Sequence, residues 1–208
     1  MNSLKTKVKK NIRWVVLFIS IIILICIIEN LLQNDIAKFD NTIYSFIANY
    51  ISKPLTNIAI IITTLGSAYV ILPICLILVV VFWKRVEGIF VSVNLGIAFV
   101  ANQILKRIVA RPRPEIYRIV EEAGYSFPSG HSMVSMAFYG LIIYLIYKKV
   151  KNPYIKWITC ISLTILILLI GLSRIYLGVH YASDVIAGFC ISIAYLSLFT
   201  HIISQKIE

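Results

Sequence analysis

The stretch WVVLFISIIILICII, from Trp14 to Ile28, contains no charged residue and a single hydroxyl group, that of Ser20. Continued to Leu32, it reaches the length of about 20 mostly apolar residues that a helix needs to cross a bilayer. The basic segment MNSLKTKVKKNIR precedes it, as in a signal peptide, but no small-residue cleavage site follows. We therefore expect a retained membrane-spanning helix, which decides the fold class of the chain.

Apolar runs of similar length recur along the whole sequence. Of the 208 residues, 60% are hydrophobic and the mean hydropathy is +0.89, which excludes a water-soluble globular core. The sequence predicts one all-α, integral membrane domain over residues 1–208, built as a six-transmembrane helix bundle. The predicted spans are Trp14–Leu32, Asn57–Trp83, Gly88–Leu105, Ser132–Tyr147, Trp157–Leu172 and Val185–Ile203.

The segment between the first two spans, Asn34–Leu55, is too polar to cross the membrane, but its apolar residues recur at helical spacing. We expect an amphipathic helix that lies flat on the outer membrane surface. Within the second span, Gly66 and Pro73 either kink the helix or are simply tolerated, as such residues commonly are in membrane helices, which we favour.

The net charge of +11 would indicate nucleic-acid binding in a soluble protein, but in a membrane protein its distribution indicates topology. With six spans, one set of basic residues lies entirely on one side, which the positive-inside rule assigns to the cytoplasm. We therefore expect a multi-pass cell-membrane protein with both termini cytoplasmic and no nucleic-acid partner. The residues in this set are Lys5, Lys7, Lys9, Lys10, Arg13, Lys84, Arg85, Lys148, Lys149, Lys151, Lys156 and Lys206.

The opposite side also carries basic residues, against the usual bias. Many of them fall in or beside the polar connection Lys106–Pro128, which is too charged to be buried in lipid. A cluster that opposes the topology rule indicates a functional reason for its presence. Its members are Lys38, Lys53, Lys106, Arg107, Arg111, Arg113, Arg118 and Arg174.

Metal and disulfide chemistry have little support in the sequence. Cys26, Cys75, Cys160 and Cys190 lie within apolar runs, without paired spacing and without histidines at metal-ligand intervals, so we interpret them as inert core residues. We expect no metal and no cofactor. The sequence leaves the oligomeric state open.

Three polar groups adjoin the outer ends of predicted helices: KRIVARPRP after the third span, FPSGHS before the fourth, and SRIYLGVHYASD between the fifth and the sixth. Lys106, Arg113 and Arg174 within them supply fixed positive charges, and the two guanidinium groups can form paired contacts with an oxyanion. Together they predict a phosphate-binding site at one membrane depth.

The segment before the fourth span fits such a site. Pro128 ends the incoming loop, Ser129 is a good helix N-cap, and Gly130 allows another group to approach the backbone closely. Free amide groups and the positive end of the helix dipole then face an anion. His131 follows immediately and can donate a proton to a leaving oxygen.

His180 and Asp184 are four residues apart, so they share a face if the sixth helix has begun by residue 180. The carboxylate would then hold the proton of one ring nitrogen and leave the other nitrogen as a nucleophile or base. Asp184 is equally a candidate N-cap of that helix. His201 stands alone near the cytoplasmic end, and we interpret it as structural.

These residues resemble the three motifs of the type 2 phosphatidic acid phosphatase family. Lys106 to Pro114 resembles the first motif, Pro128 to His131 the second, and Ser173, Arg174, His180 and Asp184 the third, with matching spacing and within residues 106–184. The resemblance implies a metal-independent phosphatase in which His180 attacks phosphorus, Asp184 orients His180, and His131 protonates the leaving group. Lys106, Arg113, Ser129, Gly130 and Arg174 would hold the phosphoryl oxygens.

The resemblance also implies a lipid phosphate as substrate, in contact with membrane lipids and bound at the outer face. Bacterial members of similar length act on phosphatidylglycerophosphate, phosphatidic acid or undecaprenyl pyrophosphate. The main alternative is a transporter or flippase of an anionic lipid, but ion-coupled carriers tend to hold ionisable residues near the membrane midplane, and the predicted helix centres are nearly free of charge. Other polar residues either shape head-group choice or are solvated or structural, which we favour: Glu29, Arg111, Arg118, Glu121, Glu122 and Tyr176.

Overall fold

The computed structural model describes residues 2–115 and 118–207, and the side chains of residues 12–115 and 118–206. The N-terminal lysines Lys5, Lys7, Lys9 and Lys10, which carry part of the charge asymmetry, therefore lie outside the described side chains. Within this part of the chain, every regular element is a helix, as predicted. The helices are α1 (Asn2–Leu32), α2 (Ile36–Ala48), α3 (Lys53–Leu65), α4 (Ala68–Val81), α5 (Val86–Val109), α6 (Gly130–Lys149), α7 (Pro153–Tyr176) and α8 (Ala182–Ile207).

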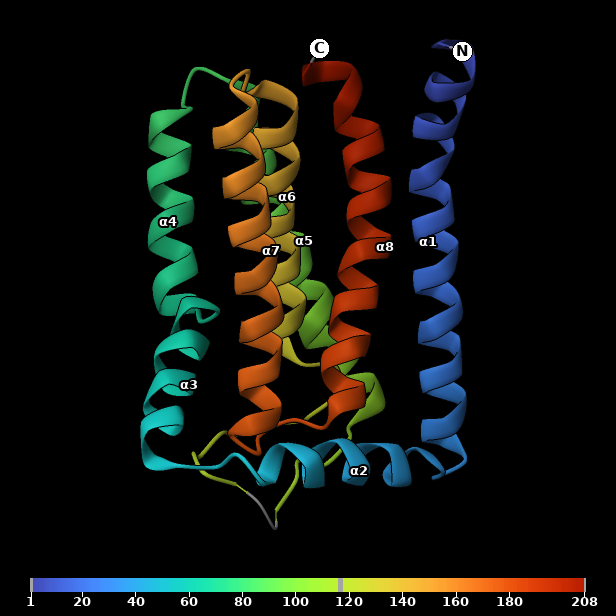
Figure 1. Cartoon of the computed structure of the whole chain (residues 1–208), viewed down its shortest axis with the longest axis vertical. Coiled ribbons are helices and arrows are strands. Elements are labelled where there is room, and N and C mark those ends of the chain that lie inside the picture. Colours follow the sequence, from blue (N-terminus) through green and yellow to red (C-terminus); the bar gives the residue numbers. More distant parts are fainter. Residues whose placement is uncertain (1, 116–117, 208) are drawn as a thin grey trace.

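Six stretches of the described residues are long and apolar enough to cross a membrane, which confirms the predicted bundle. They run upright beside one another, with both ends of the described chain at the same end of the bundle (Figure 1). Helix α6 packs against α5, α7 and α8, and α1 lies along α8. The spans are Ile12–Leu32, Lys53–Val81, Val86–Val109, Gly130–Lys149, Pro153–Tyr176 and Ala182–Lys206.

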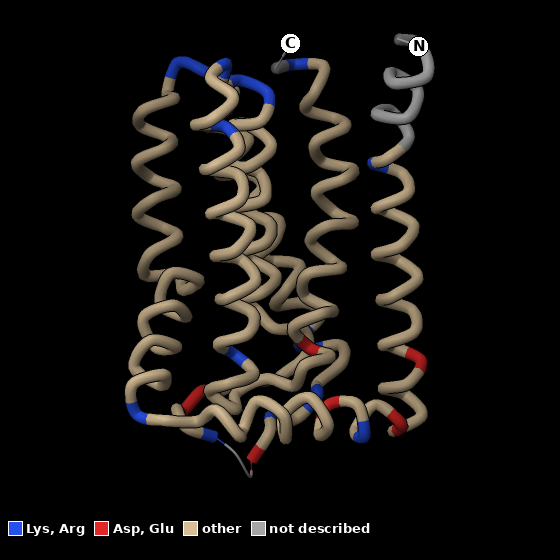
Figure 2. Tube along the Cα trace, in the orientation of Figure 1, with Lys and Arg blue, Asp and Glu red and all other residues tan. Residues whose placement is uncertain are grey.

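The amphipathic segment forms α2, which lies across the end of the bundle, crosswise to the spans (Figure 1). This confirms the expected surface helix for Ile36–Ala48, whereas Lys53–Leu65 belongs to α3 and enters the membrane. Both charge signs occur at the α2 end, while the connections at the opposite end are basic (Figure 2). Cys75, Cys160 and Cys190 are buried as expected, but Cys26 is exposed on α1, so its assignment to the core was wrong.

The second span is interrupted at Gly66 and Ser67, so the tolerance without a kink that we favoured was wrong at Gly66, whereas Pro73 stays within α4. The glycine has a steric reason, because a Cβ atom at residue 66 would lie 2.5 Å from Ile170 Cγ2 of α7. Polar side chains bond to carbonyl groups at the break: Tyr139 Oη donates to Leu65 O at 2.7 Å, and Ser67 Oγ to Thr64 O at 2.6 Å. Such bonds make a break tolerable at membrane depth.

Close contact between α6 and α8 positions the start of α6. A Cβ atom on Gly188 of α8 would lie 3.0 Å from Ser129 O and 3.2 Å from Met133 N, both main-chain atoms. The same pair is joined by Ser192 Oγ, which donates to Met133 O at 2.6 Å. Small residues allow membrane helices to pack at this separation, where dispersion contacts and hydrogen bonds drive association.

Substituting Gly188 by alanine should therefore overpack this contact. We expect the free energy of unfolding to fall by about 1–3 kcal/mol, since main-chain atoms cannot rotate away. Thermal unfolding of the purified protein in detergent measures the change. Gly96→Ala in α5 is the control, because a Cβ atom there meets nothing within 4 Å. Equal melting temperatures for the two variants would contradict the tight packing described here.

Candidate active site

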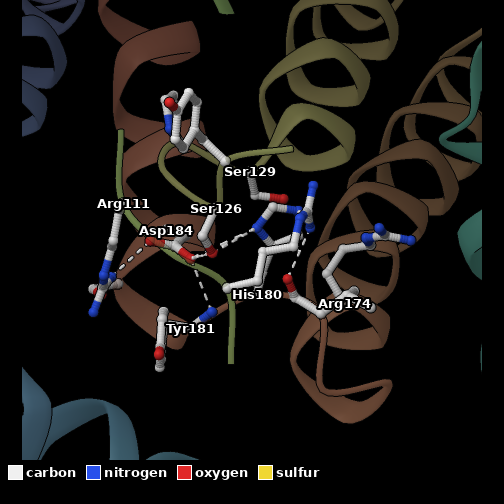
Figure 3. A network of polar contacts seen from close by, with 12 residues as sticks. Arg111, Ser126, Ser129, Arg174, His180, Tyr181 and Asp184 are labelled. Atoms are coloured by element: carbon white, nitrogen blue, oxygen red, sulfur yellow. Dashed lines mark hydrogen bonds and ion pairs between the residues drawn. The ribbon is translucent and has the colours of Figure 1, made fainter. Parts of the chain in front are cut away.

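Three segments that are distant in sequence meet at the α2 end of the bundle. The loop after α5, the start of α6 and the α7–α8 connection surround His180, as the sequence motifs predicted (Figure 3). Main-chain bonds join them: Ser129 N donates to Asp184 O at 3.1 Å, and His180 N donates to Arg174 O at 3.3 Å. The helices thus hold the polar groups at one depth.

The imidazole of His180 is buried between charged groups. Its Nε2 atom lies 3.1 Å from Arg113 Nη1, and its Nδ1 atom lies 3.6 Å from Asp184 Oδ2 and 3.4 Å from Ser126 Oγ. A guanidinium group has donors only, so Nε2 must accept from Arg113. The ring proton then lies on Nδ1, toward Asp184, and Nε2 carries the lone pair.

Burial lowers the pKa of His180 from 6.5 to about 4, because the imidazolium ion would lose its hydration. The Asp184 carboxylate opposes this change, while Arg113 and Arg174 reinforce it. The ring is therefore neutral at pH 7, which is the state in which a histidine nitrogen can act as a nucleophile.

Asp184 is fully buried, and its carboxylate joins four groups. Oδ1 accepts from Arg111 Nη1 at 2.7 Å, while Oδ2 accepts from Tyr181 N at 2.9 Å and from Ser126 Oγ. Helix α8 begins at Ala182, after His180, so the condition for a shared helix face is not met. The two residues meet instead because the chain turns between them, and Asp184 lies within the first turn of α8, where it accepts from Tyr181 N rather than preceding the helix as its N-cap.

The predicted cations Arg113 and Arg174 are buried beside His180 and held by hydrogen bonds. Arg113 donates to the carbonyl groups of Gly124, Ala123 and Val179 at 2.9–3.0 Å, which fixes its guanidinium plane. Arg174, 2% exposed, donates to Thr63 Oγ1 at 2.8 Å and pairs with Glu122. Its Nε atom is buried without a partner among the described residues.

Lys106 and Glu122 complete the charge distribution. Lys106 donates to Tyr125 O and interacts electrostatically with Arg113 and Arg174. Burial acts to raise the pKa of Glu122, but Arg174 outweighs it and the net pKa is lowered, so this carboxylate is ionised. It also lies 3.8 Å from Arg113, so this carboxylate partly neutralises both arginines.

The start of α6 has the predicted cap. Ser129 Oγ accepts from Ser132 Oγ at 3.0 Å and from Ser132 N at 3.5 Å, and α6 begins at Gly130. The group that approaches Gly130 is Asn102 of α5, whose Oδ1 atom would lie 3.1 Å from a Cβ atom there. His131, in the first turn, interacts electrostatically with Arg174, Glu122 and His180.

The structure also brings in residues that sequence reasoning missed or set aside. Arg111 and Glu122, which we favoured as solvated or structural, both contact predicted site residues. Ser126 and Asp40 were not selected at all. The run RPRP, in which Arg111 precedes Arg113 by two residues, was a signal for Arg111, but nothing in the sequence relates Asp40 to Arg111 or Ser183, its partners 71 and 143 residues away.

The remaining residues that were left open lie outside this centre. Tyr176 Oη accepts from Ser52 N at 3.1 Å and anchors the start of α3, as a structural residue does. Arg118 lies 3.5 Å from Glu121 within the outer loop, and Glu29 is exposed on α1. The ring of His201 contacts Trp14 of α1, with centroids 5.5 Å apart.

The pKa of His180 can be measured directly. We expect its ring to stay neutral as the pH falls through 6.5 and to take up a proton near pH 4, because burial disfavours the charged form. NMR of histidine labelled with ¹⁵N, in detergent, reports the protonation of each ring, and His201→Asn and His180→Asn assign the signals. A His180 signal that titrates near 6.5 would contradict this burial.

Comparison with known proteins identifies relatives for this chain. A model described as the PAP2 superfamily matches residues 87–208. Phosphatidylglycerophosphatase B of Bacillus subtilis (strain 168) is 33% identical over 138 residues, covering 64% of this chain and 67% of that protein. Undecaprenyl-diphosphatase of Sulfolobus acidocaldarius is 29% identical over 152 residues, covering 69% of each.

Two solved structures share the arrangement of helices. A transmembrane PAP2 type phosphatidylglycerolphosphate phosphatase from Bacillus subtilis superimposes with a TM-score of 0.79 at 28% identity, covering 94% of this chain and 97% of that one. LpxE from Aquifex aeolicus superimposes with a TM-score of 0.60 at 27% identity, covering 76% and 93%.

Proposed function

The chain belongs to the PAP2 superfamily and is a membrane lipid phosphatase, and on that premise we propose that His180 is the residue that attacks phosphorus. Asp184 orients the ring, His131 protonates the leaving group, and five further residues hold the phosphoryl oxygens. These five are Lys106, Arg113, Ser129, Gly130 and Arg174.

The state of the His180 ring carries this proposal. Nε2 bears the lone pair and lies 3.1 Å from Arg113 Nη1, while Nδ1 is directed at the buried Asp184 carboxylate. A neutral imidazole with one nitrogen oriented by a carboxylate and the other directed at cations suits attack on an anionic phosphoryl group. Positive charge beside the nucleophile offsets the repulsion between the attacking lone pair and the phosphoryl oxygens.

The cations give the transition state its electrostatic stabilisation. Charge on the equatorial oxygens must be matched by fixed donors, and Arg113 and Arg174 are held by hydrogen bonds before substrate arrives. The Nε atom of Arg174 is a buried donor without a partner among the described residues, which a phosphoryl oxygen would satisfy. A second contact, from Nη2 of Arg174 to the phosphoryl group, requires Glu122 to move, because Glu122 pairs with that nitrogen.

The reaction then has two balanced steps. In the first, the hydrogen bond from Arg113 Nη1 to Nε2 breaks, the freed lone pair forms a bond to phosphorus, the bond from phosphorus to the lipid oxygen breaks, and that oxygen takes a proton from His131. In the second, water attacks the phosphohistidine, gives its proton to His131, and the electron pair of the broken N–P bond returns to Nε2. Inorganic phosphate and a dephosphorylated lipid leave the site.

The substrate class follows from the position of the site at the membrane boundary and from the relatives. Two of them are named for phosphatidylglycerophosphate and undecaprenyl diphosphate, which supports a lipid phosphate or diphosphate, with phosphatidic acid a further member of the class. We propose that the site faces the exterior and both termini the cytoplasm, because the basic connections lie at the end opposite α2 (Figure 2).

Attack by His180 predicts a covalent intermediate. Rapid quenching in base during turnover of a ³²P-labelled lipid phosphate should trap label on the protein, and His180→Ala should abolish both label and turnover. His201→Ala is the control, because its ring contacts Trp14 and lies near the other end of α8. The label should be lost on mild acid treatment and map by mass spectrometry to the peptide that contains His180.

A different stereochemical result would exclude this route. Two successive displacements retain configuration at a chiral phosphorus atom, whereas one direct attack by water inverts it. Inversion, together with label-free protein in the quench, would reassign His180 as a general base.

The proposed orientation predicts that two reporters, one at each end of the bundle, lie on opposite sides of the membrane. A reporter fused to the C-terminus should be active in the cytoplasm, and one inserted after Glu121, whose side chain is 94% exposed in the outer loop, should be active outside. Paired fusions to alkaline phosphatase and a fluorescent protein measure both. Two reporters on the same side would reject this orientation and the six-span topology together.

A further inference from the structure

The surface helix α2 carries one buried carboxylate. Asp40 is 2% exposed, although α2 lies across the end of the bundle and is otherwise mostly open to its surroundings. Its Oδ1 atom accepts from Ser183 N, and its Oδ2 atom accepts from Ser183 Oγ and Arg111 Nη2, each at 2.8 Å. A carboxylate this deeply buried requires such partners, because desolvation of an unpaired charge is costly. Asp40 thus joins α2 to the first turn of α8.

Arg111 connects this carboxylate to the candidate active site. One terminal nitrogen, Nη2, pairs with Asp40, while Nη1 lies 2.7 Å from Asp184 Oδ1 and 2.8 Å from Ser183 Oγ. The guanidinium group also stacks on the ring of Tyr181, 3.9 Å from its centroid. Figure 3 shows Arg111 directed at Asp184 from the side opposite His180.

The two oxygens of Asp184 have different partners as a result. Oδ1 is held by Arg111, and Oδ2 is left to face His180 Nδ1, Ser126 Oγ and Tyr181 N. A carboxylate held at one oxygen cannot rotate freely about its Cβ–Cγ bond. Arg111 therefore controls the direction in which Asp184 presents its second oxygen to His180.

Arg111 is poorly suited to bind phosphate itself. It lies between two carboxylates, Asp40 and Asp184, whose charges exceed its own, and its planar face is covered by Tyr181. Burial acts to lower the pKa of Arg111, but Asp184 and Asp40 outweigh it and the pKa is raised, so the guanidinium group is charged. The two carboxylates already neutralise this charge. Arg113 and Arg174 differ in this respect, since each faces His180 or Glu122.

We infer that Asp40 and Arg111 are a positioning pair for the phosphatase reaction, in which the membrane-surface helix α2 fixes Arg111, Arg111 fixes Asp184, and Asp184 orients His180. The inference rests on the proposed role of His180. It makes α2 part of the catalytic apparatus, although no residue of α2 touches the reacting atoms.

Asp40→Asn tests the pair by removing one charge at constant size. We expect kcat to fall by about tenfold to a hundredfold, the range that a small misplacement of reacting groups produces, with KM changed by less than about threefold. Asp35→Asn is the matched control, because Asp35 precedes α2, is exposed and makes no side-chain cap bond. Arg111→Lys, which keeps the charge but loses the paired geometry, should lower kcat to a similar extent.

A double-mutant cycle separates positioning from general destabilisation. If Asp40 acts through Arg111, Asp40→Asn should change kcat by less than about twofold in an Arg111→Met background. Thermal unfolding in detergent identifies variants that are simply unstable. If Asp40→Asn does not fold, Arg111→Lys still tests the inference, because it leaves the sequence of α2 unaltered. Additive effects on kcat, or an Asp40→Asn enzyme that matches Asp35→Asn, would overturn the inference. A rise in KM alone would also overturn it, by showing that Arg111 binds substrate.

One readout does not depend on turnover. Removing the positive charge in Arg111→Met should raise the pKa of His180 above about 4, because Asp184 then stabilises the imidazolium ion without compensation. The other charged or titratable groups near His180 are Arg113, Arg174 and His131, and the variant leaves all three in place. An unchanged His180 titration would contradict the pair. If the wild-type protein had no phosphatase activity and Arg111→Met still raised the pKa of His180, the proposed function would be rejected. The contact between the pair and His180 would stand.

Discussion

The buried carboxylate of Asp184 is the group on which the α2 end of this bundle depends. A charge with no exposed surface is stable only when donors surround it, because its hydration has been lost. Here the donors come from separate parts of the chain: Arg111 and Ser126 from the long loop, Tyr181 N from the α7–α8 connection, and His180 from the same turn. Satisfying one carboxylate therefore brings together the segments that carry the three sequence motifs.

The helices supply the rigidity that such a centre requires. Gly188 lets α8 approach the start of α6, and Asn94 of α5 donates to Ala137 O of α6 at 2.9 Å in the middle of the bundle. The cations Arg113 and Arg174 are also held by hydrogen bonds and ion pairs, Arg113 by loop carbonyl groups and Arg174 by Thr63 and Glu122. Donors that are oriented before substrate arrives need no reorganisation during the reaction, which is the main source of electrostatic stabilisation in enzymes.

Much of this could be predicted from the sequence because membrane spans and short motifs are local signals. The spans follow from uninterrupted apolar runs, and α2 from apolar residues at helical spacing. The approach of His180 to Asp184 followed from their separation, although the helix begins only at Ala182. The break at Gly66 was missed because its cause is the proximity of Ile170 across the bundle. Arg111 and Asp40 were missed for a similar reason, since a charge that is solvated and one that is buried between partners look the same in a sequence.

The bond from Ser129 N to Asp184 O, at 3.1 Å, joins the start of α6 to α8 through main-chain atoms alone. Because neither side chain takes part, substitution at residue 129 by anything but proline leaves the donor intact. The loop from Arg118 to Tyr125 is also held through its main chain, since Ile119 N donates to Leu177 O at 3.0 Å and the carbonyl groups of Ala123, Gly124 and Tyr125 accept from Arg113 and Lys106. Much of the frame that holds these cations is thus independent of side-chain identity, so side chains on the loop can change during evolution while the backbone contacts are retained.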